Sequence, residues 1–461
     1  MSTTKTKPAP SSAADRRQAI ISAPIGPTLV TLTLPMLYAL VAIMSLGLVD
    51  SYFVSFLGTQ ELAAMGFIVP IAFTMTSVSL GLGMAISSLT SKLIGANRIN
   101  MAARLITDGF YLTIITSIAL SALLAWQLEA VFRLVGANEE TMPAIMLYMR
   151  TWLVGCVFLM LTQVCSSTFR AIGDTKTSAS ISIILTLINL CLDPLLIFGF
   201  GPIPAMGIKG AALATVIAVA IATLLSFYYL GFKERLLLLK LPILTEFMEN
   251  LRQLSHIALP AMLANAIVPI TGAVITSLVA FYGTHAVAGF GVGGRIEAVS
   301  LMVVYALSAT LPMFIGQNLG AGEKERISIA ITLSFKFVFT LQLLVYLVLA
   351  LFAHPISTLF SDESLVQNVI SDFLIIIPLS YGFGGMIILI NVAMNVLGKP
   401  RIALYINLIR LLLIYLPLAY LGSYLFDLKG LLMGVAFGNI LAFALAFALL
   451  KSTLKELDIQ L

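Results

Sequence analysis

Long apolar runs separated by short polar connections restrict the fold of this chain more than any other feature. A helix that crosses a bilayer needs about 20 mostly apolar residues. The runs that meet this length are 28–56, 63–91, 105–127, 143–168, 177–200, 206–231, 253–281, 287–317, 328–353, 367–395, 403–425 and 428–450. Of all residues, 60% are hydrophobic and 10% are charged, whereas soluble domains carry about 25% charged residues. We therefore expect an all-α integral membrane protein with about 12 transmembrane helices.

The distribution of basic residues predicts the orientation in the membrane. Lys and Arg gather in the two tails and in the connections that follow even-numbered runs, whereas the opposite loops hold Arg133, Lys209 and Lys429. Such residues are retained on the cytoplasmic side. We expect both termini to be cytoplasmic in a multi-pass protein of the inner (plasma) membrane. The same pattern explains the net charge of +5 without a nucleic-acid partner.

An internal repeat is visible when the chain is shifted by 225 residues. The matching pairs are Leu34-Pro35 with Leu259-Pro260, Gly58-Thr59 with Gly283-Thr284, Ala63 with Ala288, Gly66 with Gly291, Gly95-Ala96 with Gly320-Ala321, and Gly173 with Gly398. Each half holds six runs, an even number, so both halves enter the membrane in the same direction. This predicts two pseudo-symmetric six-helix bundles around a central cavity, the arrangement of many alternating-access transporters.

The repeat also divides the chain into expected regions. These are a disordered cytoplasmic tail over 1–26, an amino-terminal lobe over 27–231, a cytoplasmic linker over 232–252, a carboxyl-terminal lobe over 253–451 and a second cytoplasmic tail over 452–461. The first tail lacks the compact apolar core of a cleavable signal peptide. A cavity formed within one duplicated chain needs no second copy, so we expect a monomer.

Acidic residues inside the apolar runs are candidates for function, since each charged group at the bilayer centre costs at least about 2.5–3.5 kcal/mol. Asp50 and Asp193 each lie eight residues before a glycine at the outer end of a helix, so they share a depth. Asn189 is one turn before Asp193, and Thr215 reaches the same level on the next helix. Four oxygen-bearing side chains could therefore converge in the amino-terminal lobe.

Two carboxylates in a low-dielectric pocket cannot both ionise cheaply, which makes the pair a plausible proton carrier. The same four oxygens could instead bind Na⁺. In a purely structural interpretation, Asp193 braces the break at Pro194 and Asp50 pairs with a polar neighbour. The 225-residue shift places Ile275 and Leu418 at the equivalent positions, and this asymmetry favours ion coupling in the first half.

Glu297 is the buried acid of the second half. It could attract a cationic substrate, bind a second proton or form an ion pair with Arg410. The three cysteines and three histidines form no metal-binding pattern, and no phosphate-binding loop for ATP is present. We therefore expect a protein that is not an enzyme and that carries no cofactor and no resident metal.

Several segments, in this order along the chain, resemble the multidrug and toxic compound extrusion (MATE) transporters. They are the Leu-Pro pair near the start of each half, Val49-Asp50-Ser51-Tyr52-Phe53-Val54, Arg170-Ala171-Ile172-Gly173-Asp174-Thr175-Lys176, Asn189-x-x-x-Asp193-Pro194 and Gly210-Ala211-Ala212-Leu213-Ala214-Thr215. The resemblance implies that Asp50 and Asp193 serve proton or sodium coupling, accompanied by Asn189 and Thr215. Acids in the first half are typical of the DinF-like branch, not of the branch with key acids in helices seven and ten.

These observations predict a secondary antiporter that exports amphipathic, often cationic drugs or toxins in exchange for protons by alternating access. A sodium-coupled exporter and a flippase for a lipid-linked saccharide are the alternatives. The flippase requires a wide basic cavity for a pyrophosphate, for which Arg150, Arg295, Lys336 and Arg410 are the candidates inside the runs. A membrane-embedded enzyme or a channel fits less well, because we find no clustered catalytic residues and the halves are duplicated.

Overall fold

The computed structural model describes residues 13–238 and 244–460 and is built from helices. Their bounds are α1 (Ala13–Ser22), α2 (Ile25–Ser55), α3 (Thr59–Gly95), α4 (Ile99–Trp126), α5 (Leu128–Leu134), α6 (Met142–Ala171), α7 (Thr175–Phe198), α8 (Ile208–Tyr228), η1 (Tyr229–Lys233), α9 (Leu244–Ala280), α10 (Thr284–Ser300), α11 (Met302–Ala321), α12 (Lys324–Leu351), α13 (Ala353–Phe360), α14 (Ser364–Ile376), η2 (Ile377–Ser380), α15 (Tyr381–Val396), α16 (Pro400–Ile409), η3 (Arg410–Tyr415) and α17 (Leu416–Glu456).

The described residues form 11 helical segments that are long and apolar enough to cross a membrane. The last of these runs from Pro400 to Glu456 and contains two crossings, because the backbone reverses at Phe426 and Asp427, where Asp427 has a φ of 53°. Helices α10 and α11 together correspond to the expected run 287–317, interrupted at Leu301. The structure therefore agrees with the prediction of 12 crossings.

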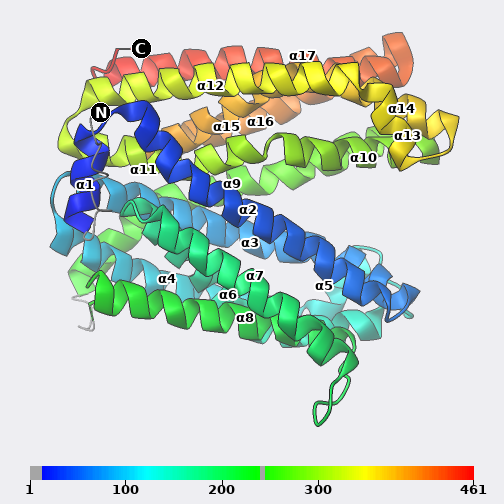
Figure 1. Ribbon diagram of the computed structural model, residues 1–461, viewed down its shortest axis with the longest axis horizontal. Helices are drawn as coiled ribbons and strands as arrows, with labels where there is room; N and C mark the ends of the chain where they lie inside the picture. The colour runs from blue at the N-terminus through cyan, green and yellow to red at the C-terminus, as the bar shows by residue number, and fades with distance from the viewer. Residues whose placement is uncertain (1–12, 239–243, 461) are drawn as a thin grey trace, which may run out of the picture.

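Two bundles are visible in Figure 1, α2–α8 in one and α9–α17 in the other. Each has its own apolar core: Phe132 and Phe169 are fully buried in the first, Phe314 and Phe373 in the second. The bundles meet at the end where both chain termini lie and diverge towards the opposite end (Figure 1). The predicted pair of pseudo-symmetric bundles is confirmed, in an arrangement that is closed at the terminal end.

The closed end is built on residues that the repeat relates to each other. A Cβ atom at Gly95 would overlap the backbone carbonyl of Gln317, and a Cβ at Gly320 would overlap that of Lys92. Lys92 and Gly95 correspond to Gln317 and Gly320 under the 225-residue shift. The two lobes therefore touch symmetrically across a pseudo-two-fold axis, and glycine is needed wherever one backbone meets another this closely.

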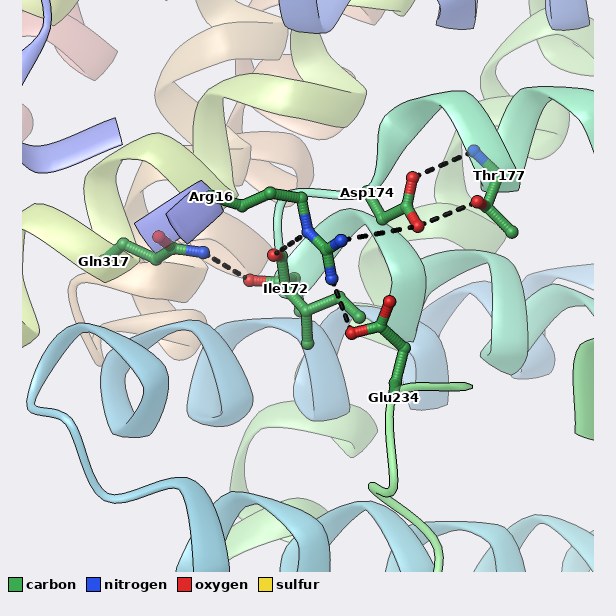
Figure 2. Close-up of polar contacts among 7 residues, drawn as sticks. Arg16, Ile172, Asp174, Thr177, Glu234 and Gln317 are labelled. Carbon is green, nitrogen blue, oxygen red and sulfur yellow. Dashed lines mark hydrogen bonds and ion pairs between the residues drawn. The ribbon is translucent and has the colours of Figure 1, made fainter. Parts of the chain in front are cut away.

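Helix α1 lies at this closed end (Figure 1), and Figure 2 shows the contacts of its Arg16. Arg16 donates to the Ile172 carbonyl of the amino-terminal lobe at 3.4 Å and to Glu234 Oε2, in the segment that follows this lobe, at 2.6 Å. From the other lobe, Gln317 Nε2 donates to the Ala171 carbonyl at 2.8 Å, and Arg326 donates to the Ala23 carbonyl at 2.6 Å. Contacts of α1 and of the lobes themselves thus hold this end shut.

The expectation of a disordered tail over 1–26 is wrong for its described part. Residues 13–22 form α1 and α2 begins at Ile25, because Arg16 and Ile20 find partners and are buried against both lobes. Residues 1–12 lie outside the described part. Helix α9 begins at Leu244, inside the expected linker, and α17 continues to Glu456, beyond 451.

Close glycine contacts also join the last two crossings within each lobe. Gly210 packs on the carbonyl of Leu196, and Gly430 packs on the carbonyl of Gly422. The π-helical turn η3, at Arg410–Tyr415, lies in the second lobe only a few residues before the second of these contacts. The 225-residue shift places Leu418 at the position that corresponds to Asp193.

Candidate functional site

The four polar residues predicted for the amino-terminal lobe meet at one point. Asp50 comes from the last third of α2, Asn189 and Asp193 from one face of α7, and Thr215 from α8. With its amide nitrogen turned towards the acids, Asn189 donates to Asp50 Oδ1 and to Asp193 Oδ2, each at 3.0 Å, and its oxygen accepts from the Thr215 amide at 3.2 Å. One amide therefore bridges both carboxyl groups and the neighbouring helix.

This acidic cluster is only partly shielded from solvent. Asp193 and Asn189 are 0% and 1% exposed, whereas Asp50 and Thr215 are half-buried. Helix α7 continues through Pro194 to Phe198, so there is no broken helix for Asp193 to brace, as the structural interpretation would require. A pair of buried carboxyl groups is costly to ionise together, and a shared proton is the simplest way to lower that cost.

Tyr148 on α6 belongs to the same cluster, which the sequence interpretation missed. Its side chain lies close enough to Thr215, Asp50 and Asp193 to interact electrostatically with all three. The side chain is 6% exposed. A buried tyrosine normally has a partner for its hydroxyl, but Thr215 lies on a helix more than 60 positions later in the chain. Spacing along one helix could not reveal it.

The orientation of Asn189 follows from its surroundings. Asp50 Oδ1 and Asp193 Oδ2 both accept from the amide nitrogen, and the amide oxygen accepts from the Thr215 N–H. In this orientation both polar atoms of the side chain have partners.

The geometry of the acidic cluster can also be compared with that of a Na⁺ site. Sodium requires oxygen ligands converging on one point, whereas the ionised cluster directs an N–H donor between its two carboxylates. Among the described residues, no three His, Cys, Asp or Glu side chains are grouped to hold a metal. Four oxygen-bearing side chains thus meet around one N–H donor.

Glu297 lies in the other lobe, on α10, and does not reach the acidic cluster. Its electrostatic partner is Arg410, as one of the sequence interpretations proposed. Arg410 donates to Asn439 Oδ1 at 2.8 Å and to the Tyr415 hydroxyl, and Asn439 Nδ2 donates to Ser380 Oγ at 2.8 Å. The acid is thus part of a polar network that also includes a base, unlike Asp50 and Asp193.

A cavity of about 630 Å³ separates the lobes. Glu297 and Arg410 line it, as does Arg170, which the sequence placed in a connection. The remaining basic candidates of the flippase hypothesis lie elsewhere: Arg150 on the exposed face of α6, and Arg295 and Lys336 at exposed positions. Five asparagines add amide groups to the wall, namely Asn265, Asn391, Asn395, Asn407 and Asn439.

Comparisons with known proteins agree with this architecture. The family model described as MatE matches residues 35–195 and again 260–421. A relative named FAD transporter, from Shewanella oneidensis, is 42% identical over 92% of this chain and 94% of its own length. A probable multidrug resistance protein of Bacillus subtilis, YpnP, is 29% identical over 91% of this chain and 93% of its own.

Solved structures show the same arrangement. The Vibrio cholerae MATE transporter VcmN in its bent form has a TM-score of 0.88 at 32% identity, covering 96% of this chain and 98% of that one. An outward-facing structure of a multidrug resistance MATE family transporter has a TM-score of 0.86 at 22% identity, covering 95% and 98%. The latter supports the fold alone.

Proposed function

The chain belongs to the MATE family of membrane transporters, and we propose that it exports a small organic substrate in exchange for protons by alternating access. The observation that carries the proposal is the bridge from Asn189 to Asp50 and Asp193. A buried acid pair that accepts a proton is the simplest coupling device that these residues can form. Both termini are then cytoplasmic, and the open end of the cavity faces outward.

Coupling requires that the proton and the substrate favour different arrangements of the lobes, since a ligand that binds both states equally shifts nothing. Protonation removes the charge that holds the amide of Asn189, on α7, against Asp50, on α2, and it frees α2 to move against α7. Helix α2 begins against the core of the second lobe, where Leu29 and Leu32 are buried. A change at Asp50 can thus be passed along α2 to the interface between the lobes.

The substrate is the point on which relatives differ. Two arginines and one glutamate line the cavity, which does not favour the amphipathic cations expected from the sequence. The relative at 42% identity is named FAD transporter, and the dinucleotide is an anion with aromatic rings. We propose FAD, or a similar phosphorylated aromatic compound, as the preferred substrate of a monomeric exporter. Export of cationic drugs is the alternative.

Transport into everted membrane vesicles tests the proposal. FAD and ethidium are offered separately to vesicles that contain the wild-type protein or Asp50→Asn, energised with and without a proton ionophore. We expect FAD uptake that the ionophore and the substitution each abolish. Uptake that instead follows an imposed sodium gradient would assign coupling to Na⁺. Uptake that persists in Asp50→Asn would exclude this residue from coupling.

A further inference from the structure

The wall of the central cavity contains polar atoms that the protein itself does not satisfy. Tyr381 Oη, Asn391 Oδ1, Asn395 Oδ1 and Arg410 Nε are buried and have no hydrogen-bond partner among the described residues. All four side chains line the cavity. Most buried polar atoms in proteins are paired, and an unmet one costs free energy. The four side chains make this wall polar, although these particular atoms are enclosed by protein in the arrangement seen here.

The charged side chains on this wall give it a net positive charge. Arg410 is opposed by Glu297, but Arg170 has only neutral partners in the described structure: its two terminal nitrogens donate to Ser166 Oγ and Ser167 Oγ, each at 2.7 Å. Arg170 is in the last turn of α6, where a cation stabilises the helix. That role accounts for a positive charge at this position, but it does not require the side chain to line the cavity.

We propose that Arg170 is the specificity-determining residue of the cavity and binds a phosphate or diphosphate of the substrate. This inference rests on the proposed export function and identifies the group that the cavity recognises. Arginine binds phosphate oxygens through paired N–H donors, and the uncompensated charge of Arg170 matches the anion. Tyr381, Arg410 and the two asparagines belong to the same polar wall, next to the space left for the sugar hydroxyls and ring edges of the molecule.

The size of the cavity agrees with this assignment. Pockets for small ligands are about 300–1,000 Å³, and this one has about 630 Å³. A diphosphate could come from a soluble dinucleotide or from a polyprenyl diphosphate that enters from the membrane. The chemistry at Arg170 is the same in both, so the source is left to the test.

Binding of flavins to the purified protein in nanodiscs tests the inference without a proton gradient. FAD, FMN and riboflavin share one ring system but carry a diphosphate, a phosphate and no phosphate, respectively. We expect the wild type to bind them in that order of decreasing affinity. Arg170→Gln should weaken FAD binding by roughly tenfold or more and change riboflavin binding by less than about twofold, as expected for loss of a charged hydrogen bond.

Matched variants separate recognition from a structural role. Arg150→Gln removes an arginine from the exposed face of the same helix and should leave all three affinities unchanged. Arg170→Lys keeps the positive charge but loses the paired N–H donors, so it should bind FAD more weakly than the wild type and more tightly than Arg170→Gln. It keeps the test informative if Arg170→Gln is not stable.

Three outcomes would overturn the inference: equal affinity of the wild type for FAD and riboflavin, a parallel loss of both flavins in Arg170→Gln, or unchanged FAD binding in that variant. Displacement of FAD by a polyprenyl diphosphate, lost in Arg170→Gln, would support the same site and assign its ligand to the membrane. Binding through Arg170 without ionophore-sensitive export would contradict the proposed function but not this inference.

Discussion

The two lobes descend from one repeat, yet their buried polar clusters have different chemistry. The amino-terminal lobe holds Asp50 and Asp193 around one amide, while the 225-residue shift places Ile275 and Leu418 at the equivalent positions of the other lobe. The carboxyl-terminal lobe instead has Glu297, which interacts electrostatically with Arg410. The first lobe thus brings an acid next to an acid, whereas the acid of the second lobe has a base as its neighbour.

This difference suggests a division of labour between the lobes. The acidic cluster does not line the central cavity, and the network around Arg410 does. The π-helical turn that begins at Arg410 is present in the second lobe and absent from the corresponding part of α7. Such turns are common at functional sites.

The largest expected effect comes from removing the acid pair. Asp193→Asn and Asp50→Asn should each lower proton-driven export by about 5–150-fold, the usual range for one coupling free energy, while substrate binding persists. The measurement is initial uptake into everted vesicles, corrected for the amount of protein. Asp372→Asn is the control, because Asp372 belongs to neither cluster. Its carboxylate forms an ion pair with Lys429, with an N–O distance of 3.0 Å. An equal loss in the control would contradict the division of labour.

A second prediction concerns the close glycine contact that joins the two lobes at the closed end. Gly320→Ala places a methyl group against the carbonyl of Lys92 and should depopulate the arrangement seen here. Distances between spin labels on the two lobes should shift towards the opposite state. Gly66→Ala is the control, since a Cβ at Gly66 meets nothing within 4 Å. Identical distance distributions in both variants would show that the glycine contact is dispensable.

A third prediction concerns the compensated acid of the second lobe. Arg410→Gln leaves Glu297 without its counter-charge and should destabilise the protein more than Glu297→Gln does. The double variant should recover part of the loss, with an interaction of about 0.5–3 kcal/mol. Thermal unfolding of all four proteins in detergent measures it. Strictly additive effects would mean that the two groups do not interact.

The smallest expected effect is that of Tyr148→Phe, which removes the hydroxyl that interacts with Thr215. The loss of one such polar interaction should cost about 0.5–1.5 kcal/mol of stability. Export should fall by less than in Asp193→Asn, since both acids remain. Thermal unfolding and vesicle uptake check the two parts. A loss of export as large as that of Asp193→Asn would make Tyr148 part of the proton path itself.

The sequence was sufficient for features that depend on position along one helix. Crossing lengths, the 225-residue repeat and the common depth of Asp50 and Asp193 follow from runs and spacings, and the four candidate residues do meet. The rotation of each helix about its axis and the contacts between distant segments cannot be predicted from these runs and spacings. Arg170 was counted with a connection but lines the cavity, Tyr148 lies on a third helix, and α1 is ordered by partners more than 150 residues away.

The most direct test is to measure proton release on substrate binding. It shows whether the first lobe binds the proton while the cavity binds the substrate. FAD is added to the purified protein in a weakly buffered solution near neutral pH, and the pH is followed together with flavin binding. The account predicts that the wild type releases protons, and that Asp50→Asn/Asp193→Asn binds FAD but releases none. Proton release that persists in the double variant, or FAD binding to the wild type without release, would contradict the account.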